Sequence, residues 1–219
     1  MAALLLVGSG ALGLAAGWVV DLVVRRVPRL TSRDPRVAPA WVMVATSALF
    51  VLVAARFGAS PDLPAFWLFA ASLVALSIID LEHRVVPNAL VYPSALGAVA
   101  LLGAAAIGIG SGRAAADALL GAAVGFGVLL GIHLIKPAGM GFGDVRLGGL
   151  IGLNVGFLGL REVVAALFVA FLLVALVGGV LVAIGRAGRH AQIPFVPFLA
   201  AGALLTVVWS SGLVRLLLG

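Results

Sequence analysis

Two aspartates, Asp80 and Asp144, are the residues of this chain whose type and setting could do chemistry. Asp80 ends an apolar run in SIIDLEHRVVPN, residues 77–88, and Asp144 begins another in GMGFGDVRL, residues 139–147. Two carboxyl groups a few ångströms apart cannot both ionise easily, so they share one proton. The ionised group can take a proton from the water that attacks a peptide carbonyl, and the protonated group can donate to the carbonyl oxygen. Such a pair hydrolyses a peptide bond without a metal and without a covalent intermediate.

The composition indicates the surroundings in which these acids must work. The chain has 219 residues, of which 63% are hydrophobic and 10% charged, and its mean hydropathy is +1.27. A soluble domain needs more polar surface than this. We therefore expect an all-α integral membrane protein, with residues 1–219 forming a single polytopic membrane domain and no separate soluble domain. The chain has no Cys, which excludes disulfides, zinc-thiolate sites and Cys nucleophiles.

Eight apolar segments are long enough, or nearly so, to cross about 30 Å of hydrocarbon as helices. They are rich in Ala, Leu and Gly and do not alternate apolar with polar residues, so helices are favoured over strands. The sixth is short and rich in Gly. The predicted helices are approximately residues 2–24, 38–55, 63–81, 88–110, 114–135, 145–160, 163–185 and 194–214.

The basic residues predict the orientation of these helices. Ten of the 14 Lys and Arg residues fall in alternate connections, beginning with the Arg-rich stretch 25–39, and four fall in the others. Cytoplasmic loops carry the excess of basic residues. We therefore expect a multi-pass protein of the cytoplasmic (inner) membrane, in contact with the lipid bilayer and with both termini outside. Nucleic acid is not expected as a partner, because the Arg residues lie between apolar runs.

This orientation brings the two aspartates to one membrane depth. The third segment runs inward and ends at Asp80, and the sixth runs outward and begins at Asp144. Both carboxyl groups are thus expected at the cytoplasmic ends of their helices, where they could meet across a bundle. An acid within the bilayer is costly and needs a reason. For either acid taken alone, an interfacial charge near Arg84 or Arg146 is the simpler interpretation.

The remaining acids have plainer interpretations. Asp21 lies four residues before Arg25, which predicts a helical ion pair. Glu82 is interpreted as a solvated acid that could also contact a basic substrate leader. Four acids fall in or beside connections, where solvated charge is expected: Asp34, Asp62, Asp117 and Glu162.

The residues around the two aspartates have physical uses of their own. Gly139, Gly141 and Gly143 let the backbone approach a partner helix or a substrate strand closely. Pro87 begins the next segment, where its missing N–H costs little. His133 is interpreted as a packed or interfacial histidine, and no metal site is expected because the histidines have no paired ligands near them in the sequence.

At these segments the sequence resembles the type IV prepilin peptidase family. IIDLEHRVVPNALVYP, residues 78–93, is similar to the family's first catalytic segment, in which six residues separate the Asp from Pro-Asp or Pro-Asn. GMGFGDVRL is similar to its second, the G-x-G-D segment. GWVVDLVVRRVPR at 17–29 and QIPFVPFLAAG at 192–202 resemble its first and last helices. Four segments in the right order are far more specific than any one of them.

The resemblance implies eight membrane helices and an aspartic endopeptidase. The expected substrates are prepilin-like membrane proteins, type IV pilins or pseudopilins, cut at the cytoplasmic face just after a basic leader. It implies that Asp80 and Asp144 are catalytic and that Gly141 and Gly143 are the conformational glycines of the second motif. Pro87 and Asn88 take the family's Pro-Asp position. Proteolysis by such a pair requires no cofactor.

One departure from the family bears on a second activity. Many bacterial members carry a Cys-bearing cytoplasmic domain after the first helix that accompanies N-methylation of the cleaved pilin. Here the corresponding connector is short and has no Cys. A cleavage-only enzyme is therefore compatible with the sequence, and S-adenosylmethionine would be needed only if methylation is retained.

Two other functions use the same features. A proton-coupled transporter could employ Asp80 and Asp144 as its relay, although its acids would lie nearer the membrane midplane and no inverted repeat is visible. A non-catalytic scaffold for pilus or secretion assembly would not depend on either aspartate.

Overall fold

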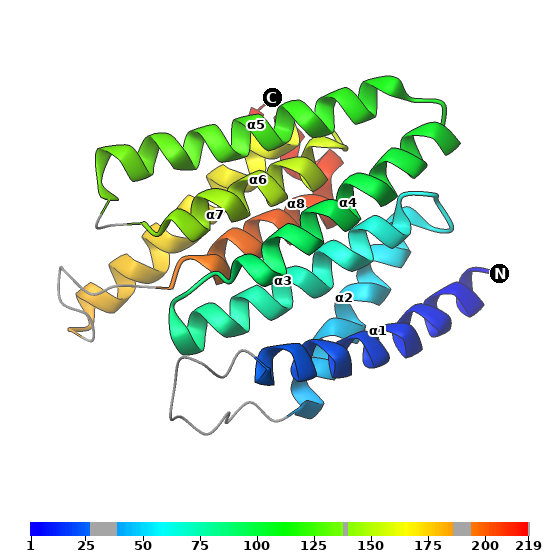
Figure 1. The fold of residues 1–219 in the computed structure, drawn as a ribbon, viewed down its shortest axis with the longest axis horizontal. Coiled ribbons are helices and arrows are strands. Elements are labelled where there is room, and N and C mark those ends of the chain that lie inside the picture. The colour runs from blue at the N-terminus through cyan, green and yellow to red at the C-terminus, as the bar shows by residue number, and fades with distance from the viewer. Residues whose placement is uncertain (27–38, 138–139, 186–193, 219) are drawn as a thin grey trace. The chain divides into compact units, whose positions relative to one another are not determined.

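The computed structural model describes residues 1–26, 39–137, 140–185 and 194–218, and these residues form eight α-helices (Figure 1). The chain divides into two compact units, Met1–Ala115 and Ala116–Gly219. The boundary lies near the start of the fifth helix. The helices are α1 (Ala2–Arg25), α2 (Pro39–Phe57), α3 (Leu63–His83), α4 (Asn88–Gly108), α5 (Gly112–Ile135), α6 (Phe142–Gly156), α7 (Leu160–Ala183) and α8 (Val196–Leu218).

The predicted all-α architecture is confirmed, with eight helices close to the predicted ranges. Among the described residues, six helices are long and apolar enough to cross a membrane: α1, α2, α3, α4, α5 and α7. The helix α6 has 15 residues, which corresponds to about 22 Å at 1.5 Å per residue. The helix α8 contains a non-helical residue, Trp209 (φ −118°, ψ 25°), and its apolar stretch Val196–Ser210 is also short.

In the first unit, α3 is the central helix. It contacts α1, α2 and α4, and 67% of its most apolar window is buried, against 33% or less in those three helices. The indole N–H of Trp67 on α3 donates to the Phe50 carbonyl of α2 at 3.1 Å. The hydroxyl groups of Ser72 on α3 and Ser94 on α4 lie 2.8 Å apart. These polar contacts fix α3 between its neighbours within an otherwise apolar core.

The helices α1 and α2 approach closely because two glycines face the α2 backbone. A Cβ atom at Gly13 would lie 2.6 Å from the Ser47 Cα, and one at Gly17 would lie 2.5 Å from the Met43 Cα. The Ser47 hydroxyl donates to the Gly10 carbonyl at 2.9 Å. Small residues at a helix contact are the usual means of close packing in lipid.

In the second unit, α6 is the central helix. It contacts α7 and α8, and its glycines pack against the glycines of α5. A Cβ atom at Gly148 would lie 2.7 Å from the Gly125 carbonyl oxygen, and one at Gly152 would overlap the Gly121 carbonyl. Eleven of its 15 residues are buried. A helix that is mostly covered by protein does not have to match the thickness of the hydrocarbon, which is compatible with its short length.

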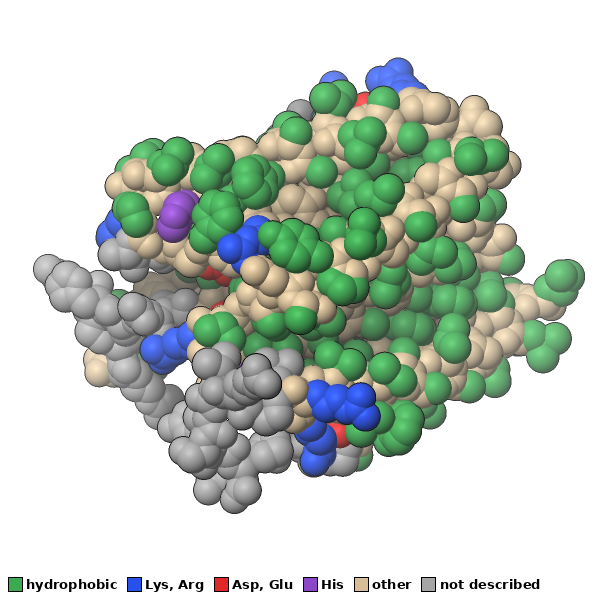
Figure 2. All heavy atoms as spheres, viewed as in Figure 1, with side chains coloured by type: hydrophobic (Ala, Val, Ile, Leu, Met, Phe, Trp, Pro, Cys, Tyr) green, Lys and Arg blue, Asp and Glu red, His purple; other side chains and the backbone are tan. Residues whose placement is uncertain are grey.

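Many of the exposed side chains of both units are apolar. Figure 2 shows hydrophobic side chains over much of the visible surface of the helices, and Leu96, Ile107, Leu134 and Ile135 are among those that are more than two-thirds exposed. Exposed apolar surface on this scale marks a membrane protein. Together with the spanning helices, it shows that the chain is a multi-pass membrane protein.

Two of the plainer predictions about acids can be compared with the structure. The ion pair of Asp21 with Arg25 is confirmed, with 2.6 Å between the Arg25 Nε and the Asp21 Oδ2. The prediction that Asp62 is a solvated charge is wrong, because its residue is only 8% exposed. Asp62 precedes α3, and its carbonyl accepts the N–H groups of Ala65 at 3.0 Å and Phe66 at 3.3 Å. Its carboxylate makes no cap hydrogen bond to α3, and its Oδ1 is buried without a hydrogen-bond partner in the described part of the chain.

Candidate active site

Asp80 lies in the last turn of the central helix of the first unit. The two residues before it, Ile78 and Ile79, are buried in a cluster with Val20 and Val24 of α1 and Val42 of α2. This cluster fixes the end of α3, and its residues on α3 belong to the apolar run that precedes Asp80 in the sequence. Asp80 itself is 5% exposed.

The chain leaves α3 immediately after Asp80. The N–H of Arg84 donates to the Asp80 carbonyl at 2.8 Å, and Arg84 adopts the left-handed conformation (φ 54°, ψ 39°) that ends many helices. Pro87 is extended (φ −72°, ψ 129°) and directly precedes α4, whose first residue is Asn88. The missing N–H of Pro87 therefore leaves no helical hydrogen bond unmade, as predicted.

Asp144 is the third residue of the central helix of the second unit. Its Oδ2 accepts the backbone N–H of Gly141 at 3.1 Å, and its own N–H donates to the Gly141 carbonyl at 3.1 Å. This reciprocal pair forms the N-terminus of α6 and leaves Asp144 8% exposed. The sixth helix runs from Phe142 to Gly156, so the predicted range 145–160 begins and ends too late. The carboxylate caps the helix from inside its first turn, and Gly159, with φ of 145°, directly precedes α7.

The glycines near Asp144 differ in their surroundings. Gly141 has φ of −70° and ψ of 148°, which any residue can adopt, and a Cβ atom there would lie an ordinary 3.5 Å from the Asp144 Oδ2. Gly143 is partly buried in the first turn of α6, and Gly139 lies outside the described residues. The close approach to a neighbouring helix occurs further along, at Gly148 and Gly152.

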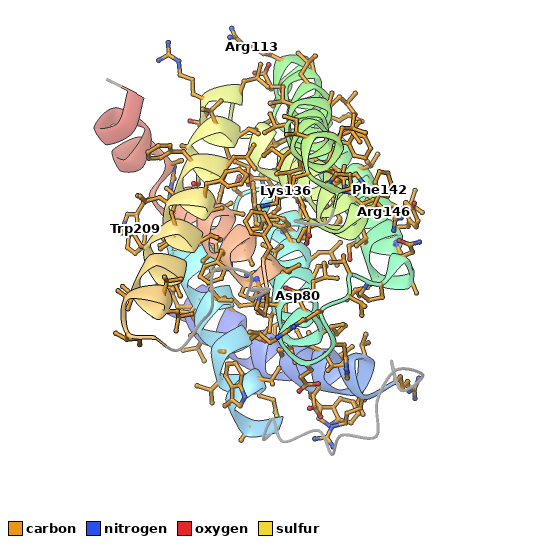
Figure 3. All side chains as sticks on the ribbon, turned by 90° about the vertical axis from the view of Figure 1, so that its left-hand side faces the viewer. Asp80, Arg113, Lys136, Phe142, Arg146 and Trp209 are labelled. Carbon is orange, nitrogen blue, oxygen red and sulfur yellow. The ribbon has the colours of Figure 1, made fainter. Side chains whose placement is uncertain are left out.

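Sequence reasoning did not find a cluster at the beginning of α6. The His133 Nδ1 of α5 lies 2.8 Å from the Met140 carbonyl oxygen, and the rings of His133 and Phe142 meet edge to face with centroids 5.7 Å apart. The guanidinium of Arg146 lies 4.8 Å from the centre of the Phe142 ring, and Figure 3 shows these two side chains side by side. His133 is thus packed, as interpreted, but against the segment that leads to Asp144.

Glu82, the predicted contact for a basic leader, lies in α3 two residues after Asp80, the last buried residue of that helix. Its carboxylate oxygen is 3.6 Å from the His83 Nε2, and its side chain is 24% exposed. It is therefore accessible in a way that Asp80 is not.

Comparison with known proteins identifies the family. Residues 67–184 match the model of the type IV leader peptidase family, a range that contains both aspartates. The chain belongs to the type IV leader peptidase family. It is 32% identical over 77% of its length to a prepilin leader peptidase/N-methyltransferase of Bacillus subtilis. Proteins of the same name from Pseudomonas aeruginosa and Xanthomonas campestris are 30% and 31% identical over 80% and 88% of the chain.

These leader peptidases are longer than the present chain. The matched parts cover 65%, 59% and 66% of the three relatives. No solved structure matches the chain.

Proposed function

We propose that this member of the leader peptidase family is an intramembrane aspartic endopeptidase that removes the basic leader from prepilin-like precursors. Asp80 and Asp144 form its catalytic pair. The observation that carries the proposal is that Asp80 and Asp144, the two aspartates in the range matched by the family that are buried, each lie at one end of the central helix of their unit. A buried acid in a membrane protein is costly, and two such acids in corresponding settings have a joint use in acid–base hydrolysis.

The membrane crossings support one face for both acids. Between the end of α3 and the beginning of α6 the chain contains two helices of spanning length and composition, α4 and α5. Two crossings return the chain to the face from which it started, so Asp80 and Asp144 belong to the same face whether or not α6 crosses the bilayer completely. The distribution of Lys and Arg predicts that this face is cytoplasmic and that both termini lie on the opposite, outer side of the membrane.

The helix ends give the two carboxyl groups different roles. Asp144 lies at the N-terminal, positive end of α6 and accepts the Gly141 N–H, and both features stabilise a negative charge. Asp80 lies at the C-terminal end of α3, where the helix dipole favours the neutral acid. Asp144 is therefore the base that takes a proton from the attacking water, and Asp80 is the acid that gives its proton to the carbonyl oxygen of the scissile bond. When the resulting diol collapses, Asp144 passes the water-derived proton to the leaving nitrogen and Asp80 takes back a proton from the hydroxyl that becomes the new carbonyl.

The substrate is a prepilin-like membrane protein whose leader is basic. Glu82 is close to Asp80 in sequence and partly exposed, so it could attract that leader electrostatically. Pro87, Asn88 and the glycines 139, 141 and 143 support the two catalytic segments. The proposed unit of activity is the single polytopic domain 1–219.

Proteolysis by the pair uses no cofactor in this proposal. The three relatives named above are also named N-methyltransferases, and that second reaction would take its methyl group from S-adenosylmethionine. The residues between α1 and α2 contain no Cys, so a zinc-thiolate module cannot accompany it there.

Cleavage in reconstituted membranes tests the proposal. The substrate is a prepilin-like peptide with a basic leader, Gly at the cut and a hydrophobic helix after it. Wild type is compared with Asp80→Asn and Asp144→Asn, and with Asp21→Asn as a control that removes an equally buried acid paired with Arg25. All variants are first compared for helicity and thermal unfolding. We expect wild type and the control to cut and both test variants to be inactive.

Other outcomes distinguish the alternative functions. Near-full cleavage by either test variant contradicts the acid pair. A folded wild type that cuts none of a panel of pilin-like substrates contradicts the peptidase. Proton-coupled solute uptake that is lost in both variants would then support the transporter, and unaffected pilus or secretion assembly in both variants would support the scaffold.

A further inference from the structure

We propose that His133 is a positioning residue for Asp144, acting through the peptide group that joins Met140 to Gly141. The inference rests on the proposed function, because it assigns a role toward the catalytic base. It involves only Phe126 and His133 of α5 and residues 140–146, all of which belong to the second unit.

The first step is the hydrogen bond of the imidazole. The His133 Nδ1 lies 2.8 Å from the Met140 carbonyl oxygen. A carbonyl oxygen can only accept, so Nδ1 carries the hydrogen and donates it. This contact fixes the tautomer of the neutral ring, with its lone pair on Nε2.

The second step uses the other side of the same peptide group. The carbonyl of Met140 and the N–H of Gly141 belong to one planar amide, and the Gly141 N–H donates to the Asp144 Oδ2 at 3.1 Å. Donation to the carbonyl draws electron density from the nitrogen and makes its N–H a better donor, so the two hydrogen bonds strengthen each other. His133 thus holds and polarises the group that orients the carboxylate.

Aromatic packing fixes the imidazole from a second direction. Phe142, two residues before Asp144, meets the His133 ring at 64° with centroids 5.7 Å apart and the Phe126 ring at 90° with centroids 6.3 Å apart. Arg146 lies over the same Phe142 ring. Since His133 and Phe126 both belong to α5, a hydrogen bond and two ring contacts hold the beginning of α6 against α5. These contacts orient Asp144.

The test compares a substitution of His133 that has a similar size but no N–H donor with one that keeps an N–H donor. His133→Leu removes the hydrogen bond, and His133→Asn retains an N–H donor near the position of Nδ1. Each variant is measured for the kcat and KM of prepilin-like peptide cleavage and for hydrogen–deuterium exchange of the Gly141 amide. We expect His133→Leu to lower kcat about tenfold, the factor that corresponds to one hydrogen bond's net contribution, with KM unchanged and faster Gly141 exchange. His133→Asn should restore both quantities to near the wild-type values.

The results separate this inference from the proposed function. If wild type cuts and folded His133→Leu keeps more than half of its kcat, or if folded His133→Asn fails to restore kcat, the positioning role is wrong. If Gly141 exchange in His133→Leu equals that of wild type, the hydrogen-bond path is wrong. If wild type cuts nothing while Gly141 exchange still follows the donor at residue 133, the peptidase proposal fails and the path to Asp144 stands.

Discussion

Replacing Gly148 by Ala adds one carbon atom where α6 meets α5, one helical turn after Asp144. The new Cβ would lie 2.7 Å from the Gly125 carbonyl oxygen and 2.6 Å from the Leu129 Cδ1. Leu129 is fully buried but can change rotamer, whereas the Gly125 oxygen is backbone and can move only with its helix. Because ordinary contact begins at 3.4 Å, the two backbones must separate by about 0.7 Å.

This displacement acts on the catalytic geometry through a rigid helix. Overpacking of this kind costs about 1–3 kcal/mol, and a misplacement of about 1 Å at reacting groups can reduce the rate about 100-fold. We expect Gly148→Ala to lower kcat/KM for prepilin-like peptide cleavage about 10-fold to 100-fold and to lower the thermal unfolding temperature in detergent.

Gly149 provides the matched control, since it is the next residue of the same helix. A Cβ atom there would lie 3.5 Å from the Phe126 Cβ, an ordinary contact. Gly149→Ala should therefore have nearly wild-type kcat/KM and stability. Equal activities of the two folded variants would refute the argument that the backbone contact at Gly148 sets the position of Asp144.

Three further predictions concern the first unit. Arg84→Gly should stabilise the protein by up to about 1 kcal/mol by relieving the left-handed conformation, and Arg84→Ala should not; chemical unfolding in mixed micelles compares them. Ser72→Ala should cost about 0.6 kcal/mol in the same assay, a typical value for a hydrogen bond between membrane helices, and Ser72→Ala with Ser94→Ala should cost less than the sum of the single changes. Glu82→Gln should raise KM for a basic-leader peptide at low salt, and the difference should shrink at high salt because ions screen a charge that is partly open to solvent; a difference in KM that does not change with salt would contradict the leader contact.

Much of the fold could be predicted because it follows from apolar run length. The eight helices and the Asp21–Arg25 pair follow from patterns within one helix. The burial of α3 does not, because α2 and α4 are equally apolar and much less buried. The sixth helix could not be delimited by the same rule. Its beginning is set by a hydrogen bond of the Asp144 carboxylate with the Gly141 N–H, and hydropathy does not register that bond.

The sequence singles out the two aspartates and does not predict the contacts around them. Asp80 and Asp144 stand out because each lies at the end of an apolar run, where an acid is costly, and both are buried in the structure; their catalytic role stays a prediction. The contact of His133 with Met140 could not be predicted, because it joins a helix to an irregular segment seven residues later and follows no period. The glycine pairs of α5 and α6 also escaped prediction, since composition indicates close packing without indicating which glycines meet.

The division into two compact units has a consequence for biosynthesis. Met1–Ala115 has internal contacts of its own, so this half can pack as it enters the membrane, before the ribosome has translated the rest. It carries Asp80 but not Asp144. On the proposed mechanism, a nascent chain that has inserted only its first four helices has no hydrolytic activity. Proteolysis begins only after the second half has been synthesised and inserted, which protects neighbouring membrane proteins from a partly made peptidase.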